Sequence, residues 1–175
     1  MDKSRLKNIL LIVFIFGTIF LFTDNLDLRR EMKKETERVY AELLSETSLL
    51  VRKTQRVNLE EVMQTEYGEM IVGGIREEYV DLNSEYFSLA NNEVRKLADI
   101  LIGVADLEET LISKGKWTKE EKEAHSGALR ALQLIMLDFN DFSESNGSWE
   151  ELFTNGDSPL IERINFRIES EGVEL

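Results

Sequence analysis

The chain has no cysteine, only one histidine, His125, and only one proline, Pro159, in 175 residues. Without cysteine the protein cannot form a disulfide, a thiol nucleophile, a cysteine-ligated zinc site or a thiol-attached lipid anchor. Residues that break helices are scarce, whereas Leu, Glu, Lys and Arg are abundant. This composition predicts an all-α protein.

The charge is strongly acidic, with a net value of −13. Residues 1–22 carry three basic side chains and Asp2, so the rest of the chain carries −15. Binding to nucleic acid depends on Lys and Arg neutralising phosphates, and we therefore expect no nucleic-acid partner. A hydrophobic content of 42 % is enough for a core and argues against a disordered acidic tail.

One long apolar run begins at Ile9 and ends at Phe22, with the sequence ILLIVFIFGTIFLF. It is uncharged, and its 14 residues fall short of the roughly 17–25 that a full membrane span needs. Leu6 extends the run if Lys7 snorkels. No small-residue cleavage site follows it, as a cleaved signal peptide would require, and it is apolar on all sides, unlike a soluble amphipathic helix. We interpret residues 6–23 as a transmembrane signal anchor that contacts the lipid bilayer.

The orientation of this anchor depends on basic residues at both ends. Lys3, Arg5 and Lys7 precede the run, and a second basic group begins at Arg29. The first group lies closer to the run, and translocating it together with the amino terminus is costly. We therefore expect residues 1–5 to form a short basic cytoplasmic tail and the rest of the chain to be extracytoplasmic at the cell membrane.

Residues 24–62 predict a long amphipathic helix. Its apolar stripe has near-heptad spacing and consists of Leu28, Met32, Val39, Leu43, Leu50 and Val57. Thr36, Glu46 and Lys53 interrupt a strict coiled-coil seam. One helix of a bundle is the preferred interpretation, and a dimeric coiled coil is the alternative.

Residues 63–170 predict an antiparallel helical bundle, and residues 171–175 a frayed tail. Asn58 with Glu61, and Thr118 with Glu121, have capping-box spacing, while Gly73-Gly74 predicts a break or kink. Two apolar-striped helices on either side of Gly115 predict a helical hairpin. Ser158 and Pro159 predict the start of a last helix. Residues 164–168 (INFRI) also alternate like a strand, but a lone strand has no evident partner.

His125 is the only candidate for a histidine-based site. Glu121 lies one helical turn before it, which permits a Glu/His metal pair. Carboxylate di-iron sites need Glu-x-x-His on two helices, and this chain has no second histidine. We interpret His125 as a solvent-side residue in an acidic first turn, and predict no catalytic, metal-binding or cofactor-binding residue.

Several aromatic residues occur beyond the long amphipathic helix, namely Tyr79, Tyr86, Phe87, Phe139, Phe142, Trp149 and Phe153. Such residues can line a ligand pocket between helices. Packing in the core is the more common role and is the preferred interpretation.

These features predict a non-enzymatic, single-pass membrane protein whose helical domain serves as a protein-interaction or scaffold module, with a protein partner or a second copy of the chain. The architecture resembles that of bitopic scaffold proteins of bacterial envelopes, although no residue motif supports the likeness. The alternative is an extracytoplasmic ligand-sensing or ligand-binding bundle that works with a partner subunit.

Overall fold

The structure is a computed structural model that describes residues 3–89, 94–144, 149–154, 158–171 and 173, with only the backbone described at 3–24, 27, 143–144, 150–151 and 154. These residues form helices and no strand, which confirms the all-α prediction. The helices are α1 (Lys3–Arg56), α2 (Leu59–Met63), α3 (Gly68–Leu89), α4 (Lys96–Lys114), α5 (Lys119–Glu144), α6 (Trp149–Thr154) and α7 (Pro159–Ser170).

The chain divides into two compact units, Met1–Val39 and Tyr40–Leu175, and α1 contributes to both. The side chains of the predicted membrane anchor lie outside the described residues. Within the portion that the structure describes, no helix is both long enough and apolar enough to cross a membrane.

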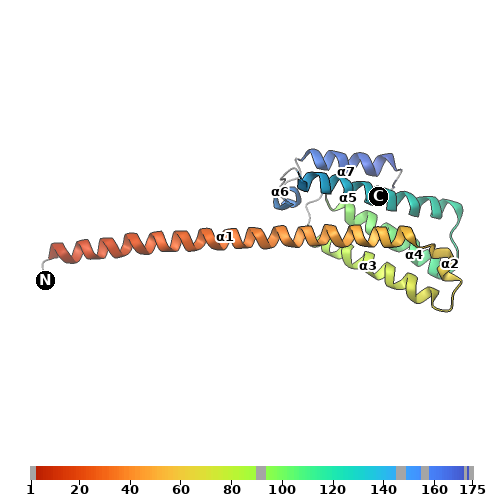
Figure 1. Ribbon diagram of the computed structural model, residues 1–175, viewed down its shortest axis with the longest axis horizontal. Coiled ribbons are helices and arrows are strands. Elements are labelled where there is room, and N and C mark those ends of the chain that lie inside the picture. The colour runs from red at the N-terminus through yellow and green to blue at the C-terminus, as the bar shows by residue number, and fades with distance from the viewer. Residues whose placement is uncertain (1–2, 90–93, 145–148, 155–157, 172, 174–175) are drawn as a thin grey trace. The chain divides into compact units, whose positions relative to one another are not determined.

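The second unit is a helical bundle, as predicted, in which α3 packs against α4 and α5 packs against α7 (Figure 1). The stripe predicted for residues 24–62 enters its core at Leu43 and Leu50, which are both buried. Leu28 and Met32, in the first unit, are exposed. A coiled coil through these two residues stays a prediction.

Two hydrogen-bonded pairs join α1 to α3 inside the core. The Tyr79 hydroxyl donates to Thr54 Oγ1 at 3.0 Å, and the Tyr86 hydroxyl lies 3.2 Å from Thr47 Oγ1. Each threonine donates its own proton to the carbonyl four residues earlier, so its oxygen accepts from the tyrosine. Because the higher-numbered threonine pairs with the lower-numbered tyrosine, the two helices run antiparallel.

Two local predictions around α2 and α3 are wrong. Asn58 lies at the N-cap of α2, but its side chain makes no capping hydrogen bond. Gly73 and Gly74 do not break a helix, because α3 runs through both. The break comes earlier, between Met63 and Gly68, where the Thr65 hydroxyl and amide both donate to the Val62 carbonyl. Apolar anchors on both sides of the glycines, Val72 and Ile75, are buried and hold the helix together.

The hairpin of α4 and α5 is confirmed, with its caps. Gly115 ends α4 in the left-handed region at φ 74°, and its amide donates to the Leu111 carbonyl at 2.8 Å. Thr118 and Glu121 form the predicted reciprocal box: the Thr118 amide donates to Glu121 Oε2 at 2.7 Å, and the Glu121 amide donates to Thr118 Oγ1 at 3.2 Å.

The last helix, α7, begins as predicted, since Ser158 accepts a hydrogen bond from the Leu160 amide and Pro159 follows at the first helical position. Residues 164–168 are helical, which rules out the strand alternative. Arg167 binds Asp138 on α5 at 2.9 Å. Beyond α7 the Val173 amide donates to the Ile168 carbonyl, whereas residues 172, 174 and 175 lie outside the description.

Aromatic residues fill the end of the core near α6. Phe153 stacks on Tyr40 with ring centroids 4.3 Å apart, and Tyr86 and Phe139 flank it. Tyr79, Tyr86, Phe139 and Phe153 are buried, as the core interpretation predicts, but Phe87 is exposed.

We expect opposite effects on stability from alanine at two glycines. Gly74→Ala should stabilise the chain by roughly 0.5–1 kcal/mol, because alanine favours helix and no atom lies within 4 Å of the added Cβ. Gly115→Ala should destabilise by about 1 kcal/mol, because L-residues avoid its positive φ. Urea midpoints of the two purified variants measure this. A destabilised Gly74→Ala variant would contradict the unbroken α3.

Candidate functional site

His125 is a core residue, which corrects the prediction of a solvent-side position. It is 5 % exposed, and its ring lies against Trp117 with centroids 4.4 Å apart. Trp117 is itself fixed in the turn before α5, because its Nε1 donates to the Leu107 carbonyl at 2.6 Å. The hairpin turn thus covers the histidine.

The group that faces His125 is Glu108 of α4, which is fully buried. His125 Nε2 lies 3.5 Å from Glu108 Oε1, and neither Glu108 oxygen has a hydrogen-bond partner among the described residues. Burial raises the pKa of the Glu108 carboxyl, against the lowering effect of His125 and of Arg76. Glu108 also contributes to raising the pKa of the Tyr79 hydroxyl, after the larger effect of burial.

The structure does not bring Glu121 and His125 together as a metal pair. Glu121 instead accepts from Lys114 and from the Thr118 amide, and these bonds lower its pKa. No group of three or more metal-ligating side chains occurs within the described ranges. Glu108 and His125 face each other at 3.5 Å, and among the described residues no hydrogen bond joins His125 to a serine or threonine hydroxyl, as activation of a nucleophile by the histidine would require.

An acidic groove lies between α1 and α3 and has a volume of about 420 Å³. Its apolar residues are Leu49, Leu50 and Leu82, and it is lined by the carboxylates of Glu46, Glu78, Asp81 and Glu85 together with Lys53. Lys53 binds Glu78 at 2.5 Å. Partial burial raises the pKa of Glu85, and the carboxylates of Glu46, Asp81 and Glu42 raise it further. The groove therefore carries four carboxylates against one lysine, around the apolar side chains of three leucines.

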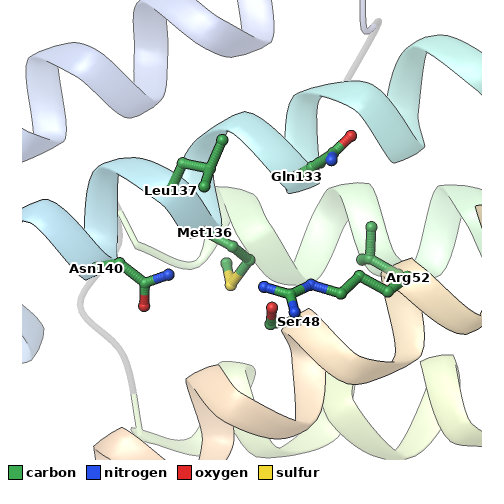
Figure 2. Close-up of a pocket in the computed structure, with 7 residues that line it drawn as sticks. Ser48, Arg52, Gln133, Met136, Leu137 and Asn140 are labelled. Atoms are coloured by element: carbon green, nitrogen blue, oxygen red, sulfur yellow. The ribbon is translucent and has the colours of Figure 1, made fainter.

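A second depression, the Arg52 cavity, lies between α1 and α5 and shares Leu49 of α1 with the acidic groove. It consists of two adjoining cavities of about 300 Å³ and 30 Å³ that share Ser48, Arg52, Met136 and Asn140. Figure 2 shows Arg52 extending across the space between the two helices, with its guanidinium group beside Met136 and Ser48. No carboxylate occurs among the described residues that line it.

No protein family, curated protein or solved structure matches this chain.

The position of Glu108 in the sequence already indicates that it is buried. Glu108 follows Val104 by four residues and precedes Leu111 by three, so it falls on the same buried face of α4. A charged residue in such a stripe indicates a buried titratable group. The sequence contains no comparable signal for the acidic groove or for the Arg52 cavity, because each depends on which helix packs against α1.

We expect Glu108→Gln to flatten the pH dependence of stability. The folded-state pKa of Glu108 is raised above its ordinary value of 4.5, so its contribution is complete below that pH and is lost as the pH rises through the folded-state pKa. Glutamine keeps the shape and cannot ionise. Relative to the native chain, Glu108→Gln should gain stability as the pH rises.

Urea midpoints between about pH 4.5 and pH 8 measure this difference. Glu109→Gln is the matched control, because Glu109 is the next residue, is more than half exposed and pairs with Arg76 at the surface. A difference between Glu108→Gln and the native chain that does not change with pH would show that Glu108 does not titrate in this range.

Proposed function

We propose that this chain is a single-pass membrane-anchored protein whose helical bundle binds another protein and catalyses no reaction. The observation that carries the interaction role is the acidic groove between α1 and α3. Leu49 is 63 % exposed there, beside the buried Leu50 and Leu82. An apolar surface surrounded by charge is typical of a recognition site rather than of a surface that only meets water.

The partner that fits this groove is a basic amphipathic helix. Its apolar face would cover Leu49, and its Lys or Arg side chains would lie near Glu46, Asp81 and Glu85. Neighbouring carboxylates contribute to the raised pKa of Glu85, so cations placed there would relieve a repulsion that the free protein carries. This complementarity favours a basic partner over a second copy of the acidic bundle.

The membrane role is proposed from the sequence of residues 9–22. The run is uncharged, and it belongs to the same helix, α1, that forms one wall of the acidic groove. We propose that Leu6 and the flanking Lys7 extend it to a full span. The basic tail would stay cytoplasmic and the bundle would be extracytoplasmic.

Ligand binding is a second candidate function, and one observation favours it. The Arg52 cavity combines a cation with an apolar wall and has the size of a small-molecule site.

A charge placed in the apolar run should release the chain from the membrane. Ile15→Arg places an arginine near the centre of the run, where insertion costs about 2.5–3.5 kcal/mol. We expect most of this variant in the soluble fraction after a carbonate wash, whereas the native chain stays in the pellet. Met32→Arg, at an exposed position outside the run, is the control and should stay in the pellet. Retention of both variants would argue against the anchor.

Photo-crosslinking in membranes of the source cells tests the groove. A photoreactive residue at Leu49 should crosslink to a basic amphipathic helix of one partner, identified by mass spectrometry of the joined peptide. The same residue at Phe166 is the control, because Phe166 is equally exposed at 62 % but lies on α7. The double substitution Asp81→Lys and Glu85→Lys should abolish the adduct, since it reverses the charge of the groove.

Three results would contradict the docking proposal. They are an adduct with a second copy of the chain, an adduct of equal yield from Phe166, and an adduct that survives the charge reversal.

A further inference from the structure

We propose that the Arg52 cavity binds a small organic carboxylate whose body is apolar. This inference uses only the bundle and does not depend on the membrane anchor or on the partner of the acidic groove. The first observation that supports it is the pairing of basic residues in the bundle. Several basic side chains of the bundle lie against carboxylates, as Arg76 does with Glu109 and Arg167 does with Asp138.

Arg52 differs from these residues. It makes no ion pair and no hydrogen bond with any residue that the structure describes, although the chain has an excess of acidic residues. Its guanidinium group extends over the cavity between α1 and α5 (Figure 2). A guanidinium group offers two parallel N–H donors, which match the two oxygens of a carboxylate.

Three further polar side chains line the same cavity with unused hydrogen-bonding capacity. Ser45 and Ser48 come from α1, and Asn140 comes from α5. None of the three makes a side-chain hydrogen bond within the described part of the chain. Hydroxyl and amide groups of this kind can complete the coordination of an anion whose charge is met by arginine.

The remaining wall of the Arg52 cavity favours a ligand with an apolar body. Leu44, Met136 and Phe139 are buried behind the cavity, and the ring of Trp149 also lines it. Trp149 lies 5.8 Å from Phe139 by ring centroids, so this wall is aromatic. A volume of about 300 Å³ is at the small end of small-molecule sites, which favours a compact ligand such as an aryl carboxylate.

Trp149 provides a direct readout of binding. The full-length chain carrying Trp117→Phe has Trp149 as its only tryptophan. The purified variant is titrated with phenylacetate, with the neutral phenylacetamide and with inorganic phosphate. We expect a saturable change in Trp149 emission with phenylacetate, and much weaker effects from the amide, which lacks the charge, and from phosphate, which lacks the apolar body.

Arg52→Gln should weaken phenylacetate binding at least about tenfold, the usual scale for losing a charge-assisted contact. Arg56→Gln is the matched control, because Arg56 lies one helical turn further along α1, is exposed and does not line the cavity. Arg52→Lys should bind with intermediate affinity, because lysine keeps the charge without the paired donors.

Several results would overturn the proposal. One is the absence of a saturable change in Trp149 emission with phenylacetate. Another is an equal affinity of Arg52→Gln and Arg56→Gln for phenylacetate. Phenylacetamide or phosphate binding as tightly as phenylacetate would show that the cavity does not require both a carboxylate and an apolar body.

Discussion

The bundle depends on two buried hydroxyl pairs, Thr47 with Tyr86 and Thr54 with Tyr79, which join α1 to α3. A tyrosine hydroxyl deep in a core needs a partner, and loss of that partner costs about 1–3 kcal/mol. Each threonine hydroxyl donates to a carbonyl of its own helix, and its oxygen accepts from the tyrosine. The two pairs are seven residues apart on each helix, so they fix both the direction and the register of α1.

Once this face of α1 packs against α3, the neighbours of its other faces are fixed as well. Leu49 and Lys53, spaced by one helical turn, border α3 and form one wall of the acidic groove. Ser45, Ser48 and Arg52 follow a three-and-four-residue spacing on a different side and border α5. A single rotation of α1 would exchange these surroundings. The hydroxyl pairs therefore determine that Lys53 lies among carboxylates and that Arg52 does not, while Leu49 lines both depressions.

Features determined by neighbouring residues could be predicted from the sequence, and features determined by distant contacts could not. The Gly115 turn, the Thr118–Glu121 box and the start of α7 at Ser158 and Pro159 depend on local backbone chemistry, and all were predicted correctly. Gly73 and Gly74 resemble a break locally, but tertiary packing of Val72 and Ile75 overrides that preference. The burial of His125 depends on Glu108 of another helix and on the hairpin turn that carries Trp117, which no local pattern contains.

The distribution of charge distinguishes the acidic groove from the Arg52 cavity. Acidic residues outnumber basic ones in this chain, and Lys53, one residue after Arg52, binds Glu78. The described lining of the Arg52 cavity nevertheless contains no carboxylate, whereas the acidic groove contains four. A cation next to acidic side chains can form ion pairs. Arg52 lies instead among serines, an asparagine and apolar residues, so ion pairing at this position does not stabilise the fold. Such a placement leaves the positive charge of Arg52 available to an anion from outside the chain, while the carboxylates of the acidic groove repel that anion.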